Sequence, residues 1–197
     1  MAKIALLTSG QVGRDLIHTL RYFPNILPVF DKSFSRSKFL KIFKRRSINF
    51  KIFLNILGSE VLFFNAMTFL KYRNIPKIDN NSDLRELVYK HNFTHVVLFN
   101  ASLIIEPSIF DPGVELLNIH CINPDLYPGL GGIEKALADK NLVQFAALHQ
   151  ITSTIDKGSI ILKNPYELKM SESSLKNRKI AFNAGIELFH IWFNNLK

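Results

Sequence analysis

The sequence predicts an α/β protein built on a mostly parallel central sheet with helices on both faces. Short apolar runs typical of buried strands alternate along the chain with longer segments whose apolar residues recur at helical spacing. Such an alternation is typical of βα units, which place helices on the two faces of a parallel sheet. A chain of 197 residues with 47% hydrophobic content can bury one sizeable core, so we expect one domain over residues 1–197.

The expected elements follow in order along the chain. Strands are predicted at residues 3–8, 26–30, 94–99, 114–119, 143–151 and 159–162. Helices are predicted at residues 11–22, from Ser82, from about Ala136, and over 171–193. Two further segments, 60–64 and 66–72, precede residues 75–78. The Ser82 hydroxyl can cap its helix, while Asp83 and Glu86 favour the positive end of the helix dipole.

The positive charge of the chain is local. The net charge is +9, and residues 32–51 hold eight Lys and Arg and no acid, so the remaining seventeen bases and sixteen acids nearly cancel. Phenylalanine and leucine recur there at near-helical spacing, which predicts a basic helical insert at about residues 32–57. The insert is either a solvated helix face or a surface for a phosphate-rich substrate, an anionic membrane or nucleic acid. No recognised nucleic-acid motif supports the last, so no nucleic-acid partner is expected.

No feature of the sequence predicts export or membrane insertion. The single cysteine cannot form an internal disulfide, the longest apolar runs fall short of a bilayer span, and the start is too short for a signal peptide. We therefore expect a cytoplasmic protein without a transmembrane segment. Cys121 stands beside His120, but nothing around it supplies the rest of a thiol catalytic set, so we interpret it as a packing residue.

Three dispersed polar residues carry the chemistry. Asn118 and His120 close a short apolar run, and their spacing of two places both on one face of the predicted strand, at the end where ligands collect in open α/β sheets. Asp156 follows in a separate loop. An amide N–H and an imidazolium can stabilise the negative charge that develops on a formyl oxygen under attack by an amine. A nearby carboxylate favours the protonated imidazole and can help to relay the proton that leaves the amine.

Each residue also has a simpler interpretation. A histidine at a strand end is often a hydrogen-bonded structural residue, and an aspartate before Lys157-Gly158 is usually a turn residue. Taken alone, neither His120 nor Asp156 excludes these interpretations; a family resemblance of the surrounding motifs favours a functional set. We interpret His149 as a strand residue near the site and not as a catalyst.

The motif Asn118-Ile119-His120, followed by Tyr127-Pro128-Gly129-Leu130 and by Asp156-Lys157-Gly158-Ser159-Ile160-Ile161, resembles the folate-dependent formyltransferases. This family includes glycinamide ribonucleotide transformylases, methionyl-tRNA formyltransferases and sugar N-formyltransferases. The resemblance is best over about residues 94–188 and includes Pro124, Ala136-Leu137 and His149. It implies a Rossmann-like fold, the catalytic set Asn118, His120 and Asp156, and N10-formyltetrahydrofolate as formyl donor. No metal ion is expected.

The resemblance also implies a pterin pocket built largely from backbone and apolar groups in two loops. These loops map to residues 100–105 and 151–155. The candidate cofactor-binding residues are Ala101, Ser102, Leu103, Ile105, Thr152, Ser153 and Thr154. Main-chain polar groups and aliphatic walls suit a flat, hydrogen-bonding heterocycle and constrain side-chain identity only loosely. The alternative is that both segments are ordinary connections.

The loop at residues 9–14 is a second candidate ligand site. Gly10 and Gly13 would let backbone amides approach a phosphate at a helix start. A dinucleotide fingerprint requires three glycines and an acid after the second strand, for which Asp31 is the candidate. Glycinamide ribonucleotide transformylases usually carry a Gly-rich loop with Ser or Thr before Asn here, and Gln11-Val12 departs from that pattern.

We therefore expect an N-formyltransferase that acts on a small-molecule primary amine, with a nucleotide-linked amino sugar as the leading acceptor because its diphosphate suits the basic insert. Lipopolysaccharide-type sugar formylation is the corresponding process. The alternatives are a glycinamide ribonucleotide formyltransferase, a formyltetrahydrofolate deformylase that uses water as nucleophile, and a degenerate member that binds anions without catalysis. Methionyl-tRNA formyltransferases carry a further C-terminal domain, for which no residues remain after the last predicted helix. A homodimer is among the expected assemblies.

Overall fold

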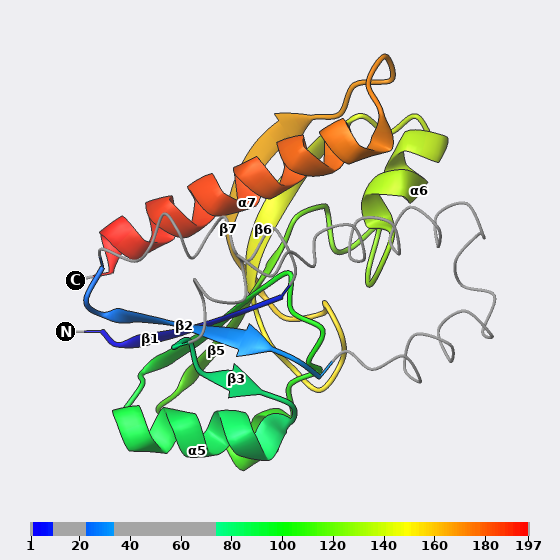
Figure 1. Ribbon diagram of the computed structural model, residues 1–197. Helices are drawn as coiled ribbons and strands as arrows, with labels where there is room; N and C mark the ends of the chain where they lie inside the picture. The colour runs from blue at the N-terminus through cyan, green and yellow to red at the C-terminus, as the bar shows by residue number, and fades with distance from the viewer. Residues whose placement is uncertain (1, 10–22, 34–73, 197) are drawn as a thin grey trace.

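The computed structural model describes residues 2–9, 23–33 and 74–196. Their strands form one sheet in the order β3-β2-β1-β4-β5-β6-β7 (Figure 1). All pairs from β3 to β5 are parallel, whereas β6 runs antiparallel to both β5 and β7. The α/β class and the mostly parallel sheet predicted from the sequence are confirmed.

Six of the seven described strands lie close to predicted positions, and β3 was not predicted as a strand. Their bounds are Ile4–Thr8 for β1, Ile26–Asp31 for β2, Lys77–Ile78 for β3, His95–Phe99 for β4, Glu115–His120 for β5, Val143–Gln150 for β6 and Ile160–Glu167 for β7. The central strands are buried on both faces, which is why β1 and β4 read as unbroken apolar runs.

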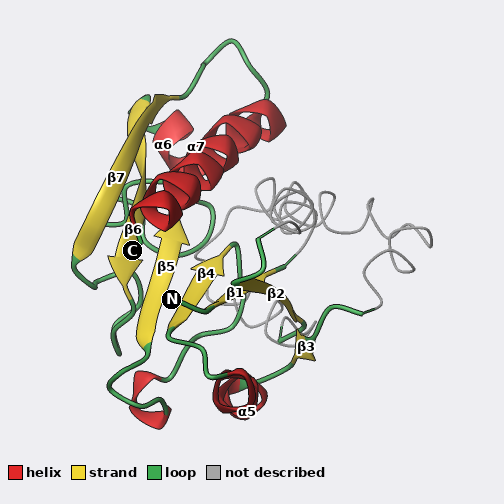
Figure 2. Ribbon diagram, turned by 90° about the vertical axis from the view of Figure 1, so that its left-hand side faces the viewer, coloured by secondary structure: helices red, strands yellow, loops and turns green. Residues whose placement is uncertain are grey.

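Helices cover both faces of this sheet. Figure 2 shows α5 (Asn81–His91) on one side and α7 (Ser174–Asn195), with the short α6 (Gly132–Ala138), on the other. Each side has its own core. Leu84 and Val88 of α5 pack with one set of strand residues, and Leu188 and Phe189 of α7 pack with the other. The predicted placement of helices on both faces is confirmed for the described residues.

Strand β7 is longer than predicted and contains a proline. The predicted strand ended at Leu162, yet the strand continues to Glu167 through Asn164-Pro165, a pair that is typical of a turn. In the described sheet β7 lies at one edge, with β6 as its neighbour. Proline lacks an N–H, but an edge position does not require that donor on its outer side. The tertiary position thus overrides the local turn signal.

The predicted cap of α5 is wrong. The helix begins one residue before Ser82, and its N-cap is Asn80, whose side-chain oxygen accepts a hydrogen bond from the Asp83 N–H at 2.9 Å. Asparagine caps as well as serine does, so sequence alone could not choose between the two. A short 3-10 turn at Pro107–Ile109, before β5, was not predicted.

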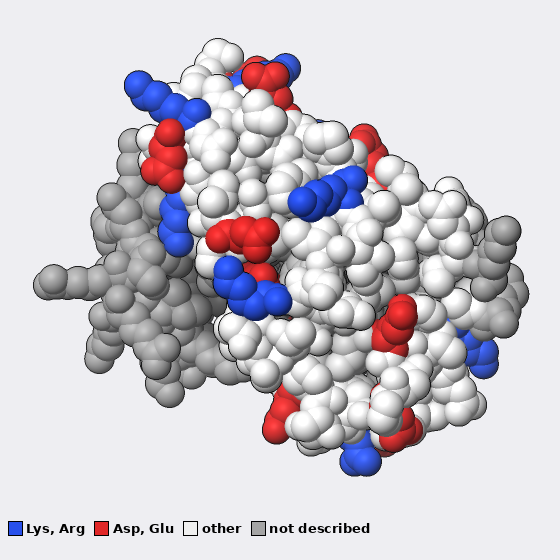
Figure 3. All heavy atoms as spheres, turned by 180° about the vertical axis from the view of Figure 1, so that it is seen from behind, with Lys and Arg blue, Asp and Glu red and all other residues white. Residues whose placement is uncertain are grey.

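Several expectations fall outside the described residues. These are the helix at 11–22, the glycine loop beyond Ser9, the segments 60–64 and 66–72, and the basic insert beyond Ser33. On the face shown in Figure 3, basic and acidic side chains of the described residues are interspersed, in agreement with the near-neutral charge of the chain outside the insert. Within the described ranges, no helix combines the length and hydropathy needed to cross a bilayer.

Candidate active site

Strand β5 presents Asn118 and His120 on one face. The alternate residues Leu117 and Ile119 are buried in the core cluster shared with α7, so the period of two turns the amide and the imidazole toward the opposite face. Beyond the strand end the chain enters the loop that contains Tyr127 and Gly129. The predicted common face of Asn118 and His120 is therefore present in the structure.

His149 meets Asn118 across the sheet. The two residues are directly opposite in the antiparallel β5–β6 pair, and Asn118 Nδ2 lies 3.1 Å from His149 Nε2. Cross-strand neighbours in such a pair project to the same side, which explains the contact. His149 is 2% exposed. The pairing of β6 with β7 shifts its register between Leu148 and His149. A buried imidazole therefore stands behind the candidate catalytic amide.

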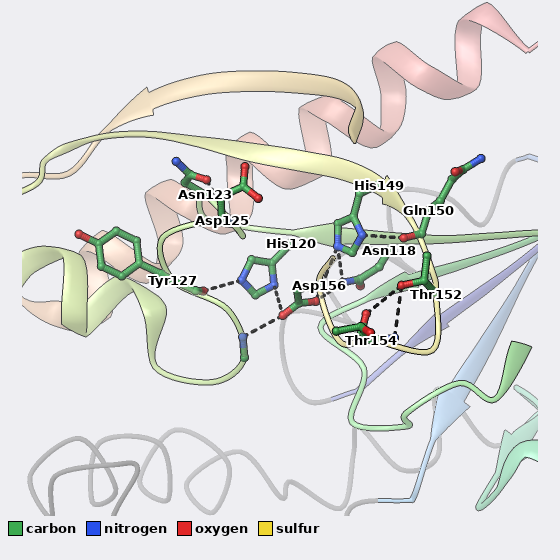
Figure 4. Close-up of polar contacts among 11 residues, drawn as sticks. Asn118, His120, Asn123, Asp125, Tyr127, His149, Gln150, Thr152, Thr154 and Asp156 are labelled. Carbon is green, nitrogen blue, oxygen red and sulfur yellow. Dashed lines mark hydrogen bonds and ion pairs between the residues drawn. The ribbon is translucent and has the colours of Figure 1, made fainter. Parts of the chain in front are cut away.

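Asp156 reaches the same place from the loop between β6 and β7. Its Oδ1 accepts from Asn118 Nδ2 at 3.3 Å, and its Oδ2 accepts from the Gly129 N–H at 2.8 Å (Figure 4). The backbone of Asp156 has φ of 56°, in the left-handed region that few non-glycine residues occupy. The hydrogen bonds of the carboxylate hold this conformation and join the loops after β5 and β6.

One ring nitrogen of His120 is hydrogen-bonded to a backbone carbonyl oxygen, and the other faces the Asp156 carboxylate. Its Nε2 lies 3.1 Å from the Tyr127 carbonyl oxygen, and its Nδ1 lies 3.7 Å from Asp156 Oδ2. A carbonyl oxygen can only accept, so Nε2 carries a proton. The second nitrogen, Nδ1, is thus the atom that can gain or release a proton beside Asp156.

The proton positions of the remaining groups follow from their partners. Nδ1 of His149 lies 2.9 Å from the Gln150 carbonyl oxygen and must donate, which leaves Nε2 of the neutral ring as an acceptor. The Asn118 amide therefore donates one N–H to His149 and the other to Asp156. A flipped amide would point its oxygen at a carboxylate and at a ring lone pair. The network thus fixes the orientation of the amide.

Burial also favours the neutral ring. Desolvation lowers the pKa of His149 below its usual 6.5, and hydrogen bonding to Gln150 and the charge of Asp156 offset this only in part. His149 is therefore an acceptor for Asn118 at neutral pH.

Cys121 takes no part in this network. It is buried in the α7 core cluster, and desolvation raises the pKa of its thiol far above the usual value. A thiol that stays protonated is a poor nucleophile, in agreement with its interpretation as a packing residue.

The structure brings Asn118, His120 and Asp156 together, and it adds His149, which the sequence interpretation had placed only near the site. The sequence signal that could have identified His149 is weak, because the register of an antiparallel pair is not readable from residue types. In the part of the chain that the structure describes, no three His, Cys, Asp or Glu side chains are arranged to hold a metal ion.

The two predicted pterin loops lie at the same side of the sheet. Ala101 of the first loop and Ile151 of the second pack against the core cluster shared with α5. In the second loop, the Thr152 hydroxyl donates to the Thr154 carbonyl oxygen at 3.0 Å, and Ser153 is exposed between them. Both loops therefore border the face on which the Asn118 amide projects.

The first loop divides its side chains between the core and the solvent. Leu103 and Ile105 are buried in the α5 core cluster, so their side chains are not available to a ligand. Ile104, which was not among the candidate cofactor-binding residues, is 67% exposed. An exposed aliphatic side chain flanked by fixed backbone is compatible with one wall of a pterin pocket.

Asp31 does not face a ribose. Its Oδ2 accepts from the backbone N–H groups of Ser102 and Leu103, and its Oδ1 accepts from the Ser33 N–H. A ribose-binding acid needs free acceptor sites directed at the ligand. The dinucleotide hypothesis is therefore not supported at this residue.

Comparison with solved structures identifies the fold. Phosphoribosylglycinamide formyltransferase from Streptococcus pneumoniae aligns with a TM-score of 0.62 and 21% identity over 96% of this chain and 95% of that one. The chain has the folate-dependent formyltransferase fold. A candidate sugar N-formyltransferase from Mycobacterium tuberculosis aligns with a TM-score of 0.67 and 14% identity over 98% of this chain and 67% of that one.

The formyltransferase fold is also shared by an enzyme with a different acceptor. A formyltetrahydrofolate deformylase from Pseudomonas syringae aligns with a TM-score of 0.65 and 14% identity over 96% of this chain and 59% of that one. A scan against protein-family models and a search of curated proteins gave no match. At these identities the likeness concerns the fold, and the choice of acceptor depends on the site.

Proposed function

We propose that the protein is an N-formyltransferase that moves the formyl group of N10-formyltetrahydrofolate to a primary amine. The observation that carries the proposal is the convergence of Asn118, His120 and Asp156 in one hydrogen-bonded network, from a strand end and a loop that are far apart in the sequence. These are the groups that formyl transfer requires, namely donors for a developing oxyanion and a carboxylate that pairs with an imidazole. The formyltransferase fold of the described residues supports the same reaction.

The chain's own residues have separate tasks in the proposed reaction. When bound, the donor would supply a formyl carbon on N10; the amine nitrogen would add to that carbon and place negative charge on the formyl oxygen, and the bond to N10 would then break as the carbonyl reforms. The Asn118 amide and the Nδ1–H of a protonated His120, whose Nε2–H is bound to the Tyr127 carbonyl oxygen, donate to the formyl oxygen as it becomes negative. The amine loses one proton and N10 gains one, so protons balance if Asp156 and His120 relay a single proton.

The observed network sets a condition on this step. Both N–H groups of Asn118 are engaged, at 3.1 Å with His149 and at 3.3 Å with Asp156. A formyl oxygen must therefore replace or share one of these acceptors. The bond to Asp156 is the longer and weaker of the two, so we expect the formyl oxygen to take that N–H while His149 keeps the other.

For the acceptor we propose the amine of a nucleotide-linked amino sugar. The support is the charge of residues 32–51, with eight bases and no acid, because a diphosphate needs cationic partners. Departure from the usual Gly-rich pattern at Gln11-Val12 argues against glycinamide ribonucleotide as acceptor. We further propose a cytoplasmic enzyme, since the folate donor is found in that compartment.

Release of tetrahydrofolate tests the proposal. The protein is incubated with N10-formyltetrahydrofolate and dTDP-linked 3- or 4-amino-dideoxy sugars, with the His120→Asn variant as the inactive control. Release that depends on the sugar supports the proposal. Turnover of glycinamide ribonucleotide with no sugar-dependent release would assign the purine reaction, and formate release without an amine would assign a deformylase.

A further inference from the structure

We infer that Asp31 is a positioning residue for the formyl donor, because its carboxylate holds the backbone of the loop at residues 100–105. The inference rests on the proposed function and on the expectation that this loop forms one wall of the pterin pocket. Asp31 ends β2 and is separated from that loop by about 70 residues of sequence. It does not touch the reacting atoms and would act only through the loop.

The carboxylate is almost fully enclosed and accepts three hydrogen bonds from backbone. Asp31 is 4% exposed; its Oδ2 accepts from the N–H groups of Ser102 and Leu103 at 2.5 and 2.8 Å, and its Oδ1 accepts from that of Ser33 at 2.7 Å. A buried carboxylate is costly unless such donors surround it. The two consecutive amides of the loop must therefore stay directed at one oxygen atom, which fixes their peptide planes.

Two further side chains hold the same loop. Asn81, at the start of α5, donates to the Ile104 carbonyl oxygen at 2.9 Å and accepts from the Glu106 N–H at 3.1 Å. At the other end, Ser9 and Asn100 exchange reciprocal side-chain bonds to each other's carbonyl oxygens. An ordinary connection needs no such set of anchors. The loop is held from β1, β2 and α5 at once.

The anchors fix the groups that a pterin would meet. The anchors engage the N–H groups of Ser102, Leu103 and Glu106 and the Ile104 carbonyl oxygen, so a ligand can meet only the remaining backbone groups of the loop and exposed side chains such as that of Ile104. Recognition by backbone groups depends on their positions to within about 0.5 Å. The residue that fixes those positions then sets donor affinity, while Asn118 and His120 set the rate of transfer.

The Asp31→Asn variant separates these roles. Asparagine keeps the size of the side chain but has a single acceptor oxygen, so its N–H₂ group must face either the two loop amides or the Ser33 N–H, and the charge that strengthens all three bonds is lost. The dissociation constant of tetrahydrofolate, measured by calorimetry, and the KM for N10-formyltetrahydrofolate should both rise about tenfold or more, with kcat within about twofold of wild type. Asn81→Ala, at a partly exposed anchor of the same loop, should raise the same two constants to a smaller extent.

A matched control removes a buried anchor elsewhere. Asn177 is 0% exposed and holds the β7–α7 loop by bonds to Lys169, Glu172 and Ser173, on the face of the sheet opposite α5. Asn177→Ala should lower the melting temperature and leave donor affinity unchanged. If Asp31→Asn does not fold, the KM of Asn81→Ala decides.

The outcomes distinguish the inference from the proposed function. Wild-type protein that neither binds tetrahydrofolate nor transfers formyl overturns both. Wild-type binding, with donor affinity unchanged in Asp31→Asn and Asn81→Ala, or lowered equally in Asn177→Ala, overturns the role of Asp31 alone.

Discussion

Asn118 and His149 face each other across β5 and β6, and the amide Nδ2 donates to the imidazole Nε2 at 3.1 Å. The other ring nitrogen of His149 donates to the Gln150 carbonyl oxygen, so the acceptor at Nε2 is fixed by the fold. Asn118 is the proposed donor to the formyl oxygen. His149 therefore orients a catalytic group without needing to meet the substrate itself.

Replacing His149 tests this orientation. In His149→Phe no acceptor faces the amide, so Asn118 can rotate and kcat should fall about 10- to 100-fold, because a small misplacement of a catalytic group costs rate. His149→Gln can still accept through its side-chain oxygen and should retain more activity. Steady-state kinetics of the two variants give the comparison, and a Phe variant with wild-type kcat would contradict the role of His149.

The lowered pKa of His149 predicts a loss of stability in acid. Burial lowers the pKa of His149 in the folded state below the usual 6.5, so the unfolded chain binds the proton more tightly than the folded one. A fall in pH below 6.5 therefore favours unfolding. The contribution of His149 is absent above pH 6.5 and becomes destabilising below it. Denaturant melts of wild type and His149→Gln from pH 8 to 5 measure the effect. If the two proteins lose stability in parallel over that range, His149 is not the cause.

The charge of Asp156 can be removed without removing its loop contact. In Asp156→Asn the side-chain oxygen can still accept from the Gly129 N–H, while the carboxylate beside His120 is lost. We expect most activity to disappear, as in His120→Asn, with thermal melts close to that of wild type because neither side chain is part of the apolar core. Rates within about tenfold of wild type would speak against the assigned roles.

Gly158 closes the loop that carries Asp156. A Cβ added there would lie 1.8 Å from the Gln150 carbonyl oxygen, a backbone atom that can move only with β6. Gly158→Ala should therefore displace the loop, destabilise the fold by about 1–3 kcal/mol and reduce activity. Gly113→Ala is the control, because a Cβ at that position has no neighbour within 4 Å. Equal melting temperatures for the two variants would show that the loop has room.

Much of this architecture is readable from the sequence because its signals are local. The apolar runs of β1, β4 and β5 and the period of two at Asn118 and His120 depend only on burial and strand geometry. What failed depended on tertiary position. Pro165 is tolerated because β7 is at the edge of the described sheet, and Asn80 took the cap that Ser82 could have provided.

The candidate site shows the same division. Asn118, His120 and Asp156 were singled out by their order in the chain, whereas the roles that we propose for His149 and Asp31 depend on partners that no sequence pattern specifies. The Asn118–His149 pair depends on the antiparallel register, and the Asp31 contacts join β2 to a loop after β4. Their roles become visible only when hydrogen-bond partners are traced in the folded chain.

The most direct test of the proposed site is a crystal structure of the protein with bound tetrahydrofolate and a nucleotide-linked amino sugar. The account predicts the pterin between the loops at residues 100–105 and 151–155, with N10 directed at Asn118 and His120 and the sugar amine beside Asp156. A folate bound elsewhere, or a site in which Asn118 and His120 are remote from N10, would contradict it.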